Sequence, residues 1–487
     1  MSTNGMEASG RVDWRRYLTL AAAVTVALKL LVSVAPAFGA TYSYLLALGY
    51  AAFVYPVWSA QRESRIPGLR LLLAGLVWAV AASCFHRYTE PEIARLMTYF
   101  LLLLLAAFIC YPMAHVLGER RNGALALVSA VLIGLVALLS LLGLALALTG
   151  GEIALYGSLA SYASGRLYMF LYPTAFAVAA TLALLLLPGA YASARRKWAR
   201  VLLLAAAVLL YLAMALTGAT ITQLLFALCA GGYAFLLAQT RLKTDNRTRR
   251  ALLSLLLAAA VLAVCFGGQY AVKRGFDAVA PEAPKRAQAA RMLPAQATLP
   301  AREGTVLQKL AMPDVLAPEE EPAAALGFVG TRLALWKGAA KLFSEKPALL
   351  ITGVSPVRME DALAVYLPKG LSGANMRALP VQALVAFGVP GLVAVLAFAV
   401  YVLVHAARLF FFGGRAYAAA ERSLALVPLF CLLADCTDCL LTFTDAGGLS
   451  NPVFFLAAGY VVFRSVEGDC RRAAGNGRGG ESSRAVR

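Results

Sequence analysis

The chain has 487 residues, of which 61% are hydrophobic and only 14% are charged, and its mean hydropathy is +0.73. A soluble globular protein is about half apolar and about a quarter charged. The composition therefore excludes a water-soluble enzyme, a disordered chain and a disulfide scaffold, and it indicates a polytopic membrane protein. The net charge of +19 has to be tested first as a topology signal.

The apolar segments predict an all-α polytopic membrane protein with about 12 transmembrane helices, because each segment is close to the length that a helix needs to cross a bilayer. The segment at 71–86 is short, and the one at 124–149 is long enough to need a tilt. In chain order the predicted spans are 17–36, 41–60, 71–86, 96–116, 124–149, 167–188, 201–217, 221–240, 251–272, 381–404, 423–441 and 451–463.

The connections between these spans sort by charge. One set carries 26 basic and nine acidic residues, which is +17 of the total +19. Positively charged connections stay on the cytoplasmic side, so both termini are predicted to be cytoplasmic and the protein to lie in the cytoplasmic (inner) membrane. Topology thus explains most of the basicity and leaves little support for nucleic-acid binding. The set consists of the N-terminus, 61–70, 117–123, 189–200, 241–250, 405–422 and the C-terminal tail.

The spans divide the chain into four parts. Residues 1–272 form an N-terminal bundle of about nine spans, 273–380 a large extracytoplasmic loop, 381–464 a C-terminal bundle of about three spans, and 465–487 a basic cytoplasmic tail. None of the eight cysteines lies in the outer loop, so a disulfide framework is not expected. Cys436 and Cys439 have the spacing of a redox or metal pair, but they lie inside an apolar span, where free cysteines act as small apolar residues. No metal or other cofactor is therefore expected.

The outer loop has two parts of different composition. Residues 278–326 are rich in Ala and Pro, which is typical of a loosely ordered strap with short helical pieces. Residues 327–380 look folded, and 331–344 has the periodicity of an amphipathic helix. Its apolar stripe consists of Leu335, Trp336, Ala339, Leu342 and Phe343.

Arg332 lies on this stripe, whereas Lys337 and Lys341 form a separate pair nearer to water. An arginine on a buried face needs an anionic or carbonyl partner. Two hypotheses stay open at this point. In one, Arg332 forms a salt bridge to Glu360 or Asp361 that pins the loop to the bundle; in the other, its guanidinium binds phosphate oxygens.

Three blocks of sequence resemble the O-antigen ligase and polymerase superfamily of bacterial glycan-assembly membrane proteins. The first runs from Gly330 through Arg332, Trp336 and Pro347 to Gly353-Val-Ser355, and is similar to that family's outer-loop block. The second, at 382–391, is similar to the start of the span after the loop, and the third, at 165–177, to the block after a mid-chain outer loop. The number of spans and the long loop before the last three spans also fit.

The resemblance implies an activity on the outer face of the membrane. Family members move a glycan from a polyprenyl diphosphate carrier, such as undecaprenyl diphosphate, to an acceptor glycan, lipid or protein. Because the leaving diphosphate gathers negative charge, such a site needs fixed cations. Our hypothesis is that Arg332 and Arg377 hold the diphosphate, with Arg166 as a third candidate and with Trp336 and Lys337 in the substrate site.

The sequence also departs from the family in two places. A His-Asn pair is usual before the glycine of the second block, but Arg377-Ala378 stands there, with Asn375 close by. A Ser-Arg pair is usual at the outer end of a middle span, and 216–222 has neither residue. A general base could then be Glu360, Asp361 or Asp445, and polymerase and ligase stay equally open.

Charged residues inside the spans support a rival hypothesis. Lys29, Asp435 and Asp438 each cost about 2.5–3.5 kcal/mol at a helix centre, so each should face a partner or a wet cavity. They form either a polar contact between spans or a path for protons or cations. The second alternative favours a transporter or a lipid-carrier flippase. A non-catalytic member of a glycan-assembly complex is the third alternative.

Overall fold

A computed structural model of the chain is mostly helical, with 82% of the residues that the structure describes lying in helices. The structure describes residues 23–24, 26–31, 66–103, 110–112, 114, 123–155, 158–163, 165–170, 173–242, 246–279, 327–368, 371–412, 419–436 and 450–482. Apolar residues dominate these segments as they do the whole chain, which agrees with the predicted all-α membrane protein.

The long helices come from the uninterrupted apolar runs. Among the described residues, six helices are long and apolar enough to cross a membrane, as expected for a multi-pass membrane protein. They are α6 (Gly123–Thr149), α7 (Pro173–Ser193), α8 (Lys197–Leu216), α9 (Thr220–Arg241), α10 (Arg247–Val279) and α17 (Leu379–Ala407), the last continuing into a π-turn, η4 (Arg408–Phe412).

Shorter helices occupy the remaining described segments. They are α3 (Leu69–Cys84), α4 (Glu90–Leu103), α14 (Gly327–Glu345), α15 (Leu349–Thr352), α16 (Met359–Ala364), α18 (Ala419–Ser423) and α19 (Leu426–Asp435). The last helix, α20 (Ser450–Ser482), continues beyond the span predicted at 451–463 through most of the predicted tail. The spans predicted at 17–36 and 41–60 lie mostly or wholly outside the described residues, and so does the strap at 278–326.

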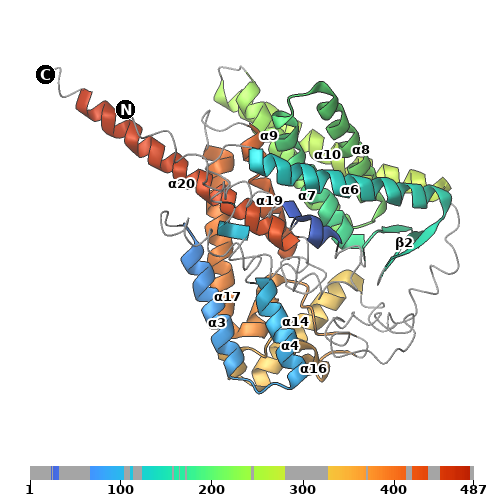
Figure 1. The fold of residues 1–487 in the computed structure, drawn as a ribbon, viewed down its shortest axis with the longest axis vertical. Helices are drawn as coiled ribbons and strands as arrows, with labels where there is room; N and C mark the ends of the chain where they lie inside the picture. The colour runs from blue at the N-terminus through green and yellow to red at the C-terminus, as the bar shows by residue number, and fades with distance from the viewer. Residues whose placement is uncertain are drawn as a thin grey trace, which may run out of the picture.

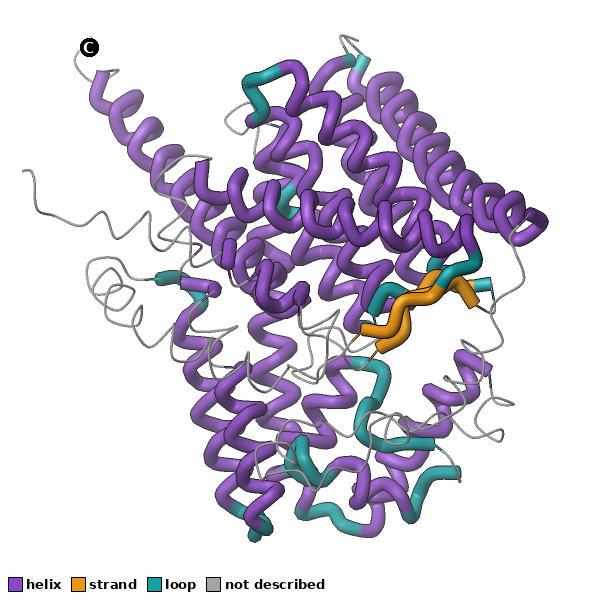
Figure 2. Tube along the Cα trace, turned by 45° about the vertical axis from the view of Figure 1, so that its right-hand side comes forward, coloured by secondary structure: helices purple, strands orange, loops and turns teal. Residues whose placement is uncertain are grey.

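A small antiparallel sheet departs from the all-α expectation. Its strands β1 (Glu152–Leu155), β2 (Ser158–Ala163) and β3 (Arg166–Tyr168) pair in sequence order, with Glu152 opposite Ser161 and Ala163 opposite Arg166. Gly165 has a φ of +67°, which suits the turn between β2 and β3. The strands lie beside one end of the helix bundle (Figure 2). The helix predicted from residue 167 therefore begins only at Pro173, after the sheet.

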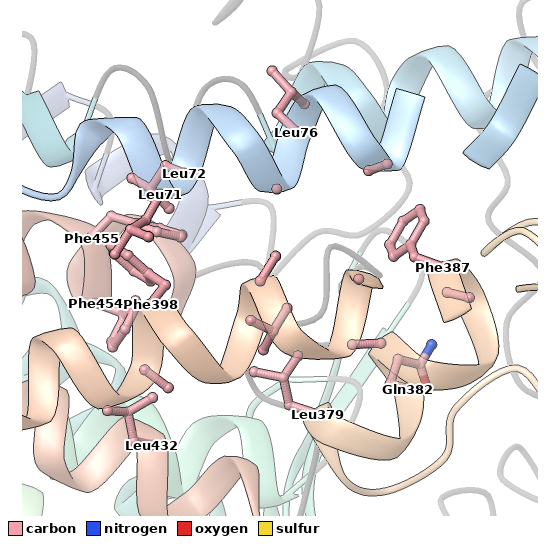
Figure 3. Close-up of a pocket in the computed structure, with 18 of the residues that line it drawn as sticks. Leu71, Leu72, Leu76, Leu379, Gln382, Phe387, Phe398, Leu432, Phe454 and Phe455 are labelled. Atoms are coloured by element: carbon pink, nitrogen blue, oxygen red, sulfur yellow. The ribbon is translucent and has the colours of Figure 1, made fainter. Parts of the chain in front are cut away.

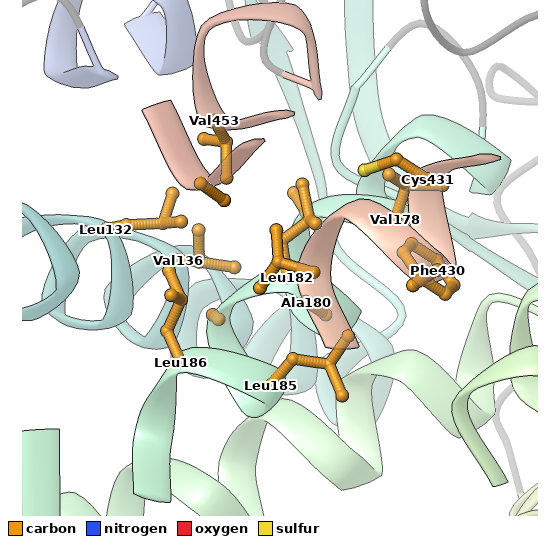
Figure 4. Close-up of a cluster of buried hydrophobic side chains, with 14 of the residues drawn as sticks. Leu132, Val136, Val178, Ala180, Leu182, Leu185, Leu186, Phe430, Cys431 and Val453 are labelled. Atoms are coloured by element: carbon orange, nitrogen blue, oxygen red, sulfur yellow. The ribbon is translucent and has the colours of Figure 1, made fainter. Parts of the chain in front are cut away.

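Buried apolar side chains form two cores. The larger one joins α6–α9, the second half of α17, α19 and α20, and Figure 4 shows part of it, with Leu132 and Val136 of α6 near Leu182 of α7 and Phe430 of α19. The smaller one joins α3, α4, α14, α16 and the first turns of α17. Figure 1 shows α17 running from the group of α3, α4, α14 and α16 toward α19 and α20. This helix therefore connects the smaller core, to which α14 and α16 belong, with the larger one.

Candidate functional site

Helix α14 packs as its periodicity predicts. Leu335, Ala339, Leu342 and Phe343 are all buried in the smaller core. Trp336 differs from them, because its ring is 40% exposed while its Nε1 donates a hydrogen bond to the carbonyl of Met376 at 3.1 Å. The indole thus ties α14 to the segment that leads into α17, one helical turn from the partly buried Arg332.

The segment before α17 is held in place from three sides. The Oε1 of Gln382 accepts a hydrogen bond from the Met376 amide at 2.8 Å, and Trp336 binds the carbonyl of the same residue. Asn375 accepts a bond from the Arg377 amide, also at 2.8 Å. Arg377 has a φ of +54°, a left-handed conformation that is uncommon outside glycine. The two arginines predicted to hold the diphosphate therefore belong to adjoining segments joined by the contact between Trp336 and Met376.

A kink in α17 receives the loop that follows α15. Gly388 has a φ of +73° inside the helix, and Pro390 has no N–H to offer the carbonyl of Ala386 four residues earlier. The loop satisfies the carbonyls that the kink leaves open: Val354 donates to Val385 at 2.8 Å, and Ser355 donates to Ala386 at 3.0 Å.

Two glycines allow this close approach. A Cβ on Gly353 would lie 2.4 Å from backbone atoms of Ala386 and Phe387, and a Cβ on Gly388 would lie 2.2 Å from the Ile351 carbonyl oxygen. The Trp78 indole of α3 completes the junction by donating to the Phe387 carbonyl at 2.9 Å. The segment around Gly353 and the first turns of α17 are thus joined directly, through their backbones.

An apolar cleft with a volume of about 140 Å³ runs between α3 and α17. Figure 3 shows its walls, which include Leu72 and Leu76 on one side and Leu379 and Phe398 on the other. Among the described residues that line it, only Gln382 and Tyr99 carry polar side-chain groups. Gln382 belongs both to the cleft and to the hydrogen bonds that hold the segment preceding Arg377. The cleft thus ends next to the predicted cationic site.

An ion pair that the sequence did not suggest fixes the loop to α4. The guanidinium of Arg358 donates to both carboxylate oxygens of Glu92, at 2.6 and 2.7 Å, and lies 5.1 Å from the centre of the Tyr88 ring. Hydrogen bonding to Arg358, and then to Thr89, lowers the pKa of Glu92 to about 2. The Glu92 carboxylate also accepts hydrogen bonds from the Thr89 amide and hydroxyl at the start of α4, and this Thr-x-x-Glu spacing is the one local signal of where the carboxylate would lie.

Buried polar atoms surround this ion pair. Within the described part of the chain, His86 Nε2, Tyr88 Oη and Ser355 Oγ are buried and have no hydrogen-bond partner. Ser355 also has a φ of +81°, which is unusual for a residue with a side chain. Burial, followed by the charge of Arg358, lowers the pKa of His86, while hydrogen bonding to the Gly353 backbone opposes the shift. The His86 imidazole is therefore held neutral beside the Gly353 turn.

The predicted acids and lysine occupy exposed positions. Glu360 and Asp361 lie on the first turn of α16, where Glu360 accepts a hydrogen bond from the Ser372 hydroxyl at 2.6 Å. Lys337 is exposed on α14, and Lys341 lies 5.9 Å from the centre of the Tyr366 ring. The pairing of Arg332 with either acid stays a prediction, and Asp445, the third candidate base, lies outside the described residues.

Arg166 belongs to a different group from the other two arginines. It lies at the start of β3, where its Cγ and the Cε of Lys273 approach Gly218. The contacts of this region connect the sheet with the ends of α8, α9 and α10, whereas Arg332 and Arg377 belong to the group around α14 and α17. Among the described residues, no contact of Arg166 therefore links it to Arg332 or Arg377.

Of the charges predicted within the spans, Asp435 is 2% exposed at the end of α19, and Asp438 lies outside the described residues. The described residues contain no group of three or more His, Cys, Asp or Glu side chains that could hold a metal ion. Comparisons with known protein families and with curated proteins give no significant match.

Proposed function

We propose that the chain is a membrane glycosyltransferase that polymerises or transfers a polyprenyl-diphosphate-linked glycan at the outer face of the cytoplasmic membrane. The observation that carries the proposal is the position of Gln382, whose side chain lines the apolar cleft and binds the Met376 amide beside Arg377. This arrangement suits a ligand with an apolar tail and an anionic head, and a polyprenyl diphosphate has both.

The prenyl chain would lie in the cleft between α3 and α17. From Gln382 to Ala399 the cleft follows α17 over 18 residues, or about 25 Å of helix. Covering a hydrocarbon chain with these apolar walls lowers the free energy by about 25 cal/mol for each Å² removed from water. An extended isoprenoid fits such a long, narrow surface better than a compact solute does.

The diphosphate would lie at the end of the cleft, between the guanidinium groups of Arg332 and Arg377. In the reaction, the acceptor oxygen bonds to the anomeric carbon, and the bond from that carbon to the phosphate oxygen breaks. The electron pair leaves with the diphosphate, where fixed positive charge stabilises it most. The acceptor proton passes to a base or to water. A strong base is not needed, because the departure of the diphosphate is the demanding part of the step.

The test is a lipid-linked glycan profile from a strain that lacks the protein, complemented with variants. Single repeat units accumulating on the carrier indicate a polymerase, and long chains on the carrier indicate a ligase. Arg332→Ala and Arg377→Ala should each reproduce the deletion profile at wild-type membrane levels. Lys341→Ala, a change to an exposed cation on the same helix as Arg332, is the matched control and should complement fully. Normal product from Arg332→Ala would contradict the proposal.

One observation favours a second candidate. Asp435 is buried near the end of α19, and an acidic residue within a membrane often belongs to a proton or cation path. A transporter or lipid-carrier flippase would use it. Two results together would favour this candidate over the transferase. Vesicles would show proton-dependent uptake or lipid translocation that is lost in Asp435→Asn, and the glycan profile of Arg332→Ala would be unchanged.

A further inference from the structure

A second cationic site lies at the end of the bundle where α7 and α9 begin and where α8 and α10 end. Arg166 on β3 and Lys273 on α10 meet there over Gly218, which has a φ of +65°. A Cβ on Gly218 would lie 3.3 Å from Lys273 Cε and 3.6 Å from Arg166 Nε, so these two atoms are at most 6.9 Å apart, the sum of the two distances. Two positive side chains are therefore held side by side.

The surrounding groups neutralise only one of the two charges. Lys273 pairs with Asp277 one turn later at 2.9 Å and also donates to the Gly165 carbonyl. The hydroxyl of the buried Tyr162 donates to the same Asp277 carboxylate, which fixes the carboxylate on the Lys273 side. Within the described residues Arg166 has neither an ion pair nor a hydrogen bond, and its side chain is exposed. An anion can therefore bind Arg166 without displacing a protein partner.

The position of the site makes a lipid the natural source of that anion. Only 6% of the most apolar stretch of α10 is buried within the protein, so this helix presents most of its surface to the bilayer. Near its end Tyr270 is exposed, and the Arg274 guanidinium lies 5.1 Å from the centre of the Tyr270 ring. Tyrosines and arginines at helix ends are typical of the level of lipid headgroups. A phosphate at that level lies within reach of Arg166.

We propose that Arg166 and Lys273 form a binding site for the phosphate of a membrane lipid, separate from the site at Arg332 and Arg377. The planar guanidinium of Arg166 binds two phosphate oxygens, and the Lys273 ammonium supplies a further charge at short range. The lipid is either an anionic phospholipid of the bilayer or a polyprenyl phosphate, since both present an anionic phosphate group. The site does not depend on the proposed transfer reaction.

Native mass spectrometry of the purified full chain in detergent can test the site. Phosphatidylglycerol, phosphatidylcholine, a polyprenyl phosphate and inorganic phosphate are titrated separately. We expect the wild type to bind phosphatidylglycerol or the polyprenyl phosphate at least tenfold more tightly than phosphatidylcholine. Arg166→Gln should weaken that binding about tenfold, as expected for the loss of a charge-assisted hydrogen bond. Arg166→Lys should keep most of it.

Arg274→Gln is the matched control, because it removes a neighbouring exposed charge from α10 without touching Gly218. It should bind lipid as the wild type does. Preference for phosphatidylglycerol assigns the site to bilayer lipid, and preference for the polyprenyl phosphate assigns it to a carrier. Three results would overturn the proposal. The wild type and Arg166→Gln could bind lipid equally, or Arg166→Gln and Arg274→Gln could lose lipid binding to the same extent. The third is that the protein binds inorganic phosphate and none of the lipids.

Discussion

Replacing Gly353 by alanine should detach the segment at 327–378 from α17. Gly353 has φ 70° and ψ −168°, a conformation that is nearly exclusive to glycine and costs a residue with a side chain about 1–3 kcal/mol. The new Cβ would also lie 2.4 Å from backbone atoms that cannot rotate away. Separating the segments to relieve the overlap breaks the two backbone hydrogen bonds from Val354 and Ser355, at about 0.5–1.5 kcal/mol each. Together these terms predict a loss of about 2–6 kcal/mol, a large fraction of the stability of a typical domain.

Two measurements would detect this loss in detergent-solubilised protein. Tryptophan fluorescence should report a lower unfolding midpoint, because the Trp78 indole binds the carbonyl next to Ala386. Limited proteolysis should cut faster within 327–378. Gly267→Ala is the control, since a Cβ there meets nothing within 4 Å and alanine favours a helix over glycine by about 1 kcal/mol. An unfolding midpoint and a proteolysis pattern in Gly353→Ala that match those of Gly267→Ala would refute the reasoning.

Three further predictions concern stability, and the first of them also concerns activity. Arg377→Gly should remove transfer activity without adding backbone strain, because glycine adopts a φ of +54° freely; full activity in a variant that folds normally would exclude Arg377 from the site. Trp336→Phe should cost about 0.5–1.5 kcal/mol in thermal unfolding by removing the hydrogen bond to Met376, and a change of no more than a few tenths would mean that this bond does not hold the loop. Unfolding free energy should fall as the pH drops below 6.5, because the folded protein holds the pKa of His86 below its ordinary value and so binds fewer protons there than the unfolded chain. A second fall is expected between pH 4.5 and about 2 from Glu92, and His86→Gln should abolish the first fall alone; a first fall that persists in this variant would assign it to another group.

The parts of the fold that follow from local periodicity could be predicted from the sequence. The buried stripe of α14 and the long helices α6–α10 are of this kind, because an apolar run of that length has few other solutions in a membrane. The sheet at 152–168 was not foreseen, since its residues lie between two spans and the apolar run after Arg166 reads as the start of the next helix.

Contacts between distant segments could not be predicted in the same way. Glu92 and Arg358 are 266 residues apart, and no local pattern indicates that they pair. Arg166 was grouped with Arg332 and Arg377 by residue type, but its neighbours are set by Gly218 and Lys273, which only the packing of α8–α10 brings together. The segments that meet at Gly353 and Gly388 are about 30 residues apart, and nothing in their local sequence indicates that they touch.

The junction between Gly353 and the kink in α17 also has a consequence for biogenesis. The amides of Val354 and Ser355 find their acceptors only at residues 385 and 386, which leave the ribosome about 30 residues later. The segment at 349–378 therefore cannot complete its docking while it is being synthesised, and it must wait until α17 has formed. A truncation ending before residue 379 should consequently leave this segment sensitive to proteases, however well the preceding helices have assembled.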